Sequence, residues 1–106
     1  MMKATIDCTN GKIFCAGYGP KSTAQLALVS DLPIPPPSNA RIVYTWTADH
    51  PNQSWTWGTG APEQSVPIRW PGEYVIQVKI TYYLPNRTRP FAAFWSNKVA
   101  VSGENC

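Results

Sequence analysis

Two tryptophans, Trp55 and Trp57, are the residues of this 106-residue chain whose type and spacing best suit ligand binding. Because Thr56 alone separates them, both indole rings lie on the same face of an extended strand. Two aromatic rings on one exposed face form a platform that stacks on sugar rings or contacts an apolar protein surface. Trp95 is a third candidate for this ligand platform. Under the alternative interpretation, alternating aromatics mark the buried face of the strand, and both rings cover the protein interior.

Catalytic chemistry is not expected from the remaining polar residues. Nucleophilic catalysis needs an oriented base, and the single histidine, His50, lies in an Asp-His-Pro-Asn turn where an exposed side chain is predicted. No G-x-S-x-G motif accompanies it. Glycoside hydrolysis needs two facing carboxylates, whereas the acidic residues are dispersed over predicted loops and turns. The sequence therefore predicts a non-enzymatic protein.

Metal and cofactor motifs are also missing from the sequence. The cysteine spacing is not C-x-x-C, and one histidine does not complete an ordinary zinc site. The chain has neither a G-x-x-x-x-G-K phosphate loop nor a D-x-D-x-D-G calcium loop. Asp49 with Asn52 is the only hint of a calcium ligand pair. We therefore expect no metal and no cofactor.

Three cysteines, Cys8, Cys15 and Cys106, allow at most one internal disulfide and leave one thiol over. A terminal strand beside the first strand would bring Cys106 near Cys8 or Cys15. A disulfide there would join the two chain ends in an oxidising compartment. Three unpaired thiols are the alternative, because composition alone does not fix the redox state. The sequence leaves the pairing open.

Charge and length restrict the class of protein. The formal charge is +3, from nine basic residues that are scattered along the chain, whereas nucleic-acid-binding proteins usually carry a clustered basic stripe. No apolar run approaches the roughly 18 residues of a membrane span. We therefore expect neither a nucleic-acid partner nor membrane insertion. The length suits a single two-layer core, so residues 1–106 are predicted to form one domain, excised from a longer protein.

Apolar and polar residues alternate with the period of a β-strand along most of the chain. The predicted strands cover residues 4–7, 12–16, 23–29, 41–48, 54–57, 64–70 and 74–81, with the last strand inside 91–102. The Asn10-Gly11 turn makes the first two segments a hairpin or one kinked strand. With about seven strands and no helical periodicity, the sequence predicts an all-β, immunoglobulin-like antiparallel β-sandwich.

The residues around the turn at Pro71-Gly72 give this prediction its detail. Tyr74 follows the turn at the start of a late strand, which fits a tyrosine corner, where the phenol hydroxyl bonds to nearby backbone. Trp46, on an earlier strand, is placed to be the buried tryptophan of a sandwich core. Both residues indicate packing rather than binding.

A known family shares these features in the same order. Tyr44 and Trp46, the run PGEYVIQV at 71–78 and the run SNKVAV at 96–101 resemble the polycystic-kidney-disease-type domain and related immunoglobulin-like modules. The match covers roughly Arg41 to Ser102. The resemblance implies a spacer, adhesion or ligand-presenting module, commonly attached to bacterial surface proteins and hydrolases, and it implies no catalysis.

The function expected from these observations is that of a non-enzymatic extracellular or cell-surface module. It would be a structural spacer, an adhesion module or a protein-interaction module, and its partners would include other domains of a larger parent protein. The alternative is a carbohydrate-binding module that binds polysaccharide through Trp55, Trp57 and Trp95. The N-x-S/T sequences at Asn52 and Asn86 would accept N-glycans in a eukaryotic secretory route, although chance explains them equally well.

Overall fold

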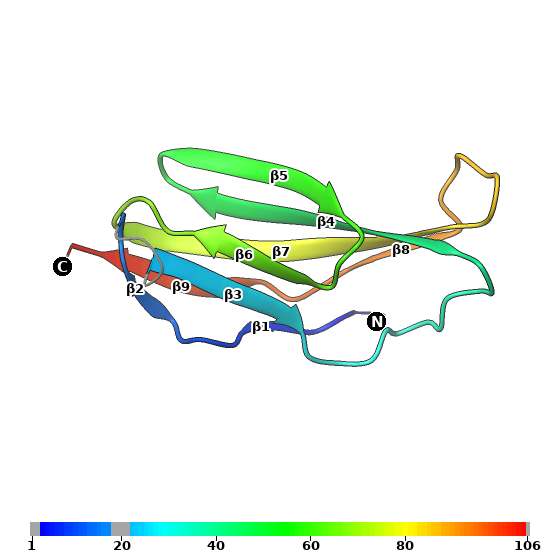
Figure 1. Cartoon of the computed structure of the whole chain (residues 1–106), viewed down its shortest axis with the longest axis horizontal. Helices are drawn as coiled ribbons and strands as arrows, with labels where there is room; N and C mark the ends of the chain where they lie inside the picture. The colour runs from blue at the N-terminus through cyan, green and yellow to red at the C-terminus, as the bar shows by residue number, and fades with distance from the viewer. Residues whose placement is uncertain (1–2, 18–21, 106) are drawn as a thin grey trace.

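The computed structural model describes residues 3–17 and 22–105, and these residues form an all-β structure without an α-helix (Figure 1). The described part of the chain contains nine strands. They are β1 (Ile6–Cys8), β2 (Ile13–Cys15), β3 (Thr23–Leu28), β4 (Arg41–His50), β5 (Gln53–Thr59), β6 (Glu63–Pro67), β7 (Gly72–Tyr83), β8 (Ala92–Trp95) and β9 (Val99–Glu104). No described helix is long and apolar enough to cross a membrane.

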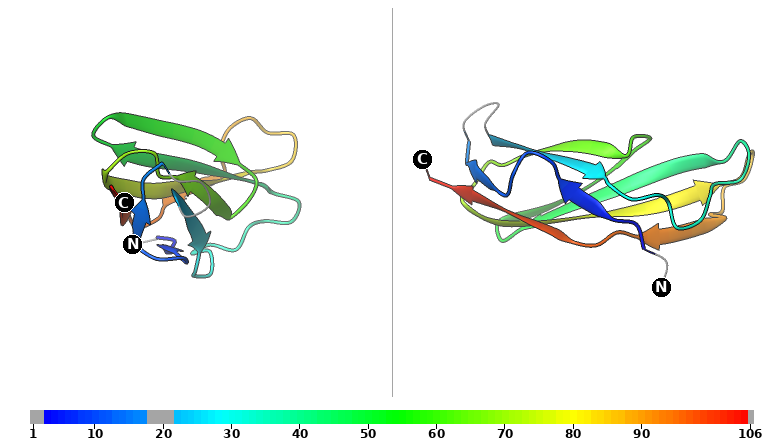
Figure 2. Two further views of the ribbon diagram at one scale, coloured as in Figure 1. Left: turned by 60° about the vertical axis from the view of Figure 1, so that its left-hand side comes forward. Right: turned by 90° about the horizontal axis from the view of Figure 1, so that it is seen from below.

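The strands form two sheets that pack face to face. The smaller sheet has the strand order β1-β3-β6, and the larger has the order β2-β9-β7-β4-β5, with β8 paired to the far half of β7. Figures 1 and 2 show the two layers of an elongated molecule, which measures 48 × 23 × 23 Å along its principal axes. The prediction of an all-β sandwich is confirmed.

The first predicted strand pair is not a hairpin, and the sandwich is not purely antiparallel. β1 pairs with β3 in the small sheet, whereas β2 pairs with β9 in the large sheet, and the β2–β9 pairing is parallel. The side chain of Asn10 accepts a hydrogen bond from the Gln25 backbone nitrogen and donates one to the Thr23 carbonyl, both at 2.8 Å. This turn is therefore tied to β3, and the chain crosses between sheets instead of folding back on itself.

The last predicted strand is also divided in two, and together with the separation of β1 from β2 this raises the count from about seven strands to nine. Between β8 and β9, the Ser96 hydroxyl accepts a hydrogen bond from the Val78 backbone nitrogen at 3.0 Å. The next side chain, that of Asn97, accepts from the Ile6 nitrogen at 2.8 Å and donates to the Ile6 carbonyl at 3.1 Å. These side-chain hydrogen bonds replace backbone pairing where β8 ends. Those of Asn97 connect the segment before β9 to β1 of the small sheet.

The core lies between the sheets and follows the alternation of β4 and β7. Tyr74, Ile76, Val78 and Ile80 of β7 are buried as predicted, and Trp46 of β4 is fully enclosed at 0% exposure. The Nε1–H of Trp46 has no hydrogen-bond partner among the described residues. Trp46 therefore stabilises the sandwich through apolar packing, against the cost of a buried donor without a partner.

Tyr74 forms the corner that its position predicts. Its hydroxyl accepts hydrogen bonds from the backbone nitrogens of Arg69 at 3.1 Å and Trp70 at 3.0 Å. Gly72 is required at the turn, because its φ is +120° and a Cβ there would lie 2.9 Å from Nε2 of His50. The corner fixes the direction in which the chain leaves β6 and begins β7.

Candidate functional site

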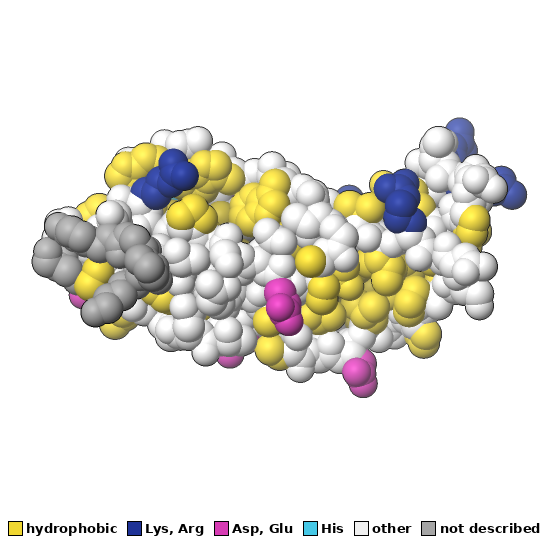
Figure 3. Space-filling view, in the orientation of Figure 1, with side chains coloured by type: hydrophobic (Ala, Val, Ile, Leu, Met, Phe, Trp, Pro, Cys, Tyr) yellow, Lys and Arg dark blue, Asp and Glu magenta, His cyan; other side chains and the backbone are white. Residues whose placement is uncertain are grey.

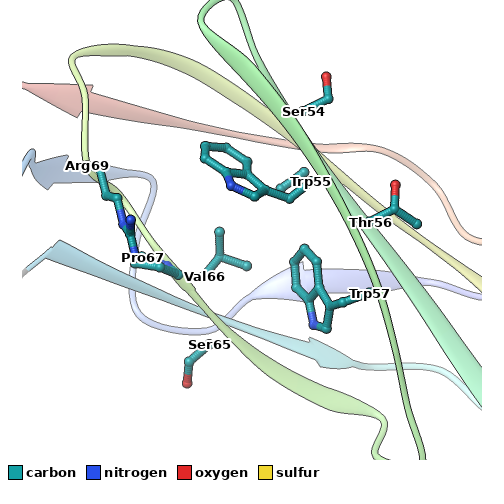
Figure 4. Close-up of a pocket in the computed structure, with 9 residues that line it drawn as sticks. Ser54, Trp55, Thr56, Trp57, Ser65, Val66, Pro67 and Arg69 are labelled. Atoms are coloured by element: carbon teal, nitrogen blue, oxygen red, sulfur yellow. The ribbon is translucent and has the colours of Figure 1, made fainter.

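The two long sides of the sandwich differ. On one side the N-terminal segment switches from the small sheet to the large one through β1 and β2, so the segment covers the gap between the sheets. On the other side, β5 ends the large sheet and β6 ends the small sheet, with no described strand between them. A groove of about 540 Å³ lies at this open side (Figure 4). Trp55 and Trp57 line it from β5, and Val66, Pro67 and Arg69 line it from β6 and the residues after it.

Trp55 is held in place by the aromatic residues of the corner. Its ring stacks on that of Trp70, with centroids 5.6 Å apart and planes at 15°. The ring of Trp55 is also nearly parallel to that of Tyr74, with centroids 6.2 Å apart and planes at 9°. Because Tyr74 is fixed by its two backbone hydrogen bonds, the ring of Trp55 is oriented before any ligand arrives.

Trp57 is oriented by a hydrogen bond across the groove. Its Nε1–H donates to Oε1 of Gln64 on β6 at 2.9 Å, and Nε2 of Gln64 donates to the Thr59 hydroxyl at 3.4 Å. The two edge strands are thus connected through side chains rather than through backbone pairing. The indole of Trp57 lies over the inner face of the sandwich, with part of its surface exposed.

The structure brings together two of the three predicted site residues. Trp55 and Trp57 share the groove and are both half-buried. Trp95 lies on the outer face of the large sheet, where it is 48% exposed and the Lys79 ammonium lies 5.5 Å from its ring centroid. Trp55 and Trp57 therefore cover the edge of the protein interior and also line an accessible groove, so the ligand-platform and the buried-face interpretations each hold in part. Trp95 is not part of this groove.

Arg69 and Val66 line the groove opposite the two tryptophans, and Gln64 accepts the hydrogen bond of Trp57; none of the three was identified from the sequence. Within residues 3–17 and 22–105 one ion pair is present, between Lys12 and Asp7, so Arg69 has no carboxylate partner there. In Figure 3, hydrophobic side chains reach the surface over β5 and β6, and a basic side chain lies among them. The groove is therefore apolar with one positive charge at its margin. The alternation of β6 was visible in the sequence, but its position opposite β5 was not.

The prediction that His50 is an exposed turn residue is wrong. His50 is 7% exposed, and its Nδ1 accepts a hydrogen bond from the Asn52 backbone nitrogen at 3.0 Å. Nε2 lies 2.9 Å from the Pro71 carbonyl and must donate to it, so the neutral ring carries its proton on Nε2. With both nitrogens engaged by backbone, and its ring 4.5 Å from that of Tyr74, His50 supports the corner.

The cysteines have two different states. Cys15 is disulfide-bonded, whereas Cys8 is a free thiol that is 6% exposed. Three unpaired thiols are therefore ruled out. Cys106 lies outside the described residues, and so does the predicted pairing that involves it. Cys15 is in register with Glu104 of β9, which places the end of the last strand beside this cysteine.

The part of the chain that the structure describes contains no group of three or more His, Cys, Asp or Glu side chains that could hold a metal. Asp49 and Asn52, the suggested calcium pair, are exposed near the β4–β5 turn. Asn52 and Asn86 of the two N-x-S/T sequences are both exposed.

The chain matches no known family model, no curated protein and no solved structure. We therefore infer its function from two physical features, the path of the chain through the sandwich and the groove between β5 and β6.

Proposed function

We propose that the chain is a non-enzymatic module of a larger extracellular or cell-surface protein, where it serves as a structural spacer and protein-interaction unit. The path of the chain carries this proposal. Ala4 forms a parallel bridge with Ser96, and Cys15 lies in register with Glu104. The N-terminal segment therefore runs in the same direction as β9, and the chain enters and leaves the sandwich at positions separated along its length (Figure 2). At about 3.3 Å per residue, the advance from Ser96 to Glu104 is roughly 26 Å.

Three further observations support the proposal. The disulfide at Cys15 fits a protein of an oxidising compartment. Both ring nitrogens of His50 are bonded to backbone, which favours a structural role for the one histidine. The resemblance of residues 41–102 to polycystic-kidney-disease-type domains adds an expectation of the same kind.

The spacer role is tested by pulling on the protein. A force between Lys12, just before β2, and the C-terminal end acts along β2 and β9 in opposite directions, so the hydrogen bonds of this parallel pair are loaded together in shear. A force between Gly17 and the C-terminal end acts at one end of the same pair and loads its bonds one after another. We expect a several-fold higher rupture force in the first geometry, measured by single-molecule force spectroscopy with the disulfide reduced. Equal rupture forces would contradict the spacer role.

The second candidate is a carbohydrate-binding module, favoured by the two oriented indoles in the open groove. Sugar rings stack on exposed indole faces, and the polar residues Ser54 and Ser65 are among those that line the groove. Affinity gel electrophoresis against plant, algal and bacterial polysaccharides tests this function. Retardation that Trp55→Ala and Trp57→Ala abolish, and that Trp95→Ala leaves intact, would establish it. Unchanged mobility with every polysaccharide would leave the spacer and interaction role in place.

A further inference from the structure

β5 is an edge strand that lacks the usual protection against pairing. It ends the large sheet, spans the seven residues Gln53–Thr59 and contains neither a charged residue nor a proline. The opposite edge strand, β6, begins at Glu63 and ends at Pro67, and β1 and β2 have only three residues each. Short length, charge and proline are the devices that keep edge strands from pairing with another chain. In the described part of the chain, β5 is the longest edge without them.

The β4–β5 hairpin determines which backbone groups of β5 face away from its sheet. His50 and Gln53 flank a two-residue turn and are paired in register, so they form the hydrogen-bonded pair that closes the hairpin. In an antiparallel ladder, every second residue then directs its N–H and C=O groups to the other side. On β5 these residues are Ser54, Thr56 and Gly58. No described strand pairs with β5 on that side.

The sequence of β5 is nearly symmetrical about Thr56. Trp55 and Trp57 flank it on one face, and the small residues Ser54 and Gly58 follow on either side. In antiparallel pairing of two identical strands about a two-fold axis, residues at equal distances from the axis lie opposite each other. An axis at Thr56 therefore sets each Trp55 opposite Trp57 of the partner subunit.

We propose that β5 pairs antiparallel with β5 of a second copy of this chain, with Thr56 opposite Thr56. The pairing joins the two large sheets into one continuous sheet and uses the outward backbone groups of Ser54, Thr56 and Gly58 in about six hydrogen bonds. This inference goes beyond the proposed spacer role and does not depend on it.

Side-chain contacts favour the second copy over an unrelated strand. Trp55 of one subunit and Trp57 of the partner subunit lie opposite each other at a position without backbone hydrogen bonds, where opposed side chains approach most closely. Aromatic pairs at such positions stabilise antiparallel strands. Charge matters as well, because a two-fold axis sets like side chains against each other. The exposed face of β5 presents Ser54, Thr56 and Gly58 near the axis, so no like charges meet there.

Sedimentation velocity across a wide range of protein concentrations tests the proposal. The natural protein should show a reversible monomer–dimer equilibrium. Thr56→Lys and Thr56→Glu each place two like charges at the axis, so each variant alone should weaken dimerisation at least tenfold. An equimolar mixture of the two should form a heterodimer, because the charges at the axis are then opposite. Thr56 is exposed, so both variants should retain the circular dichroism spectrum of the natural protein.

Two further variants separate edge pairing from other effects. Ala100→Lys adds the same charge to the same outer face, on β9 and away from the β5 edge, and should leave the dimer intact. Thr56→Pro removes an outward N–H while leaving the β4 ladder in place, and should abolish dimerisation. A natural protein that is monomeric at every concentration would overturn the proposal. So would a mixture of the Lys and Glu variants that stays monomeric, or an Ala100→Lys variant that dissociates as much as Thr56→Lys.

Discussion

At the scale of single residues, Tyr74 connects the turn after β6 with the candidate site. Its hydroxyl accepts hydrogen bonds from two backbone nitrogens, and its ring neighbours those of both His50 and Trp55. Tyr74→Phe keeps the ring but leaves two N–H groups without a partner. We expect a loss of about 1–3 kcal/mol in the free energy of unfolding, measured by urea denaturation. Tyr83→Phe is the control, because no hydrogen bond of its hydroxyl exists within the described residues, and an equal loss there would contradict the role of the corner.

Two other tyrosines predict how stability depends on alkaline pH. Burial, and to a smaller extent the charge of Tyr44, raise the pKa of Tyr82, and burial raises the pKa of Tyr44. Because the folded state holds these protons more tightly, stability is complete below the ordinary tyrosine pKa of about 10 and falls as the pH rises through the folded values. Urea midpoints measured from about pH 8 to about pH 11 should show this decline. Tyr44→Phe should make it shallower, and an unchanged slope would contradict the assignment.

At the scale of elements, β9 passes very close to the turn that precedes β7. A Cβ on Gly103 would lie 2.3 Å from the Trp70 carbonyl oxygen and 2.8 Å from Cγ2 of Ile68. Gly103→Ala should therefore displace β9 and lower the free energy of unfolding by about 1–3 kcal/mol, measured by urea denaturation. Gly60→Ala is the matched control, since nothing lies within 4 Å of a Cβ there. Similar losses in both variants would show that the contact with Trp70 is unimportant.

At the scale of the whole molecule, the disulfide of Cys15 restricts the unfolded chain. Its reduction should lower the free energy of unfolding by about 2–5 kcal/mol, as is typical for small disulfide-bonded domains. Urea denaturation with and without a reductant measures this difference. Cys8→Ser should respond to the reductant like the natural protein, because Cys8 is a free thiol, whereas Cys15→Ser should not respond. Stability that is independent of the reductant in the natural protein would contradict this prediction.

Much of the architecture was predictable because strand alternation is a local pattern. The inward face of β7, the buried Trp46 and the hydroxyl bonds of Tyr74 all follow from residues close together in sequence. The burial of His50 could not be predicted in this way. Its ring bonds to the carbonyl of Pro71, which is 21 positions away and approaches only when β4 and β7 pair. The parallel pairing of β2 with β9 was missed for the same reason, since Asn10 turns toward β3 and not back along β1.

The candidate site was predictable in part. The spacing of Trp55 and Trp57 places both rings on one face of a strand in any extended conformation. Trp95 could not be assigned, because its face depends on its pairing with Lys79. Nothing local to β5 indicates that Val66 and Arg69 lie across from it.

By itself, the sequence determined that this protein is all β, that Tyr74 forms a corner, and that the indoles of Trp55 and Trp57 share a face. The tertiary structure alone decided that β5 and β6 are edges on the same open side, that β2 runs parallel to β9, and that Trp95 is separate from the other two. The physical reason is the distance along the chain between the residues that interact. Side-chain alternation and turn geometry are set by neighbouring residues, whereas strand order and the position of an open edge arise from pairings between residues far apart in the chain.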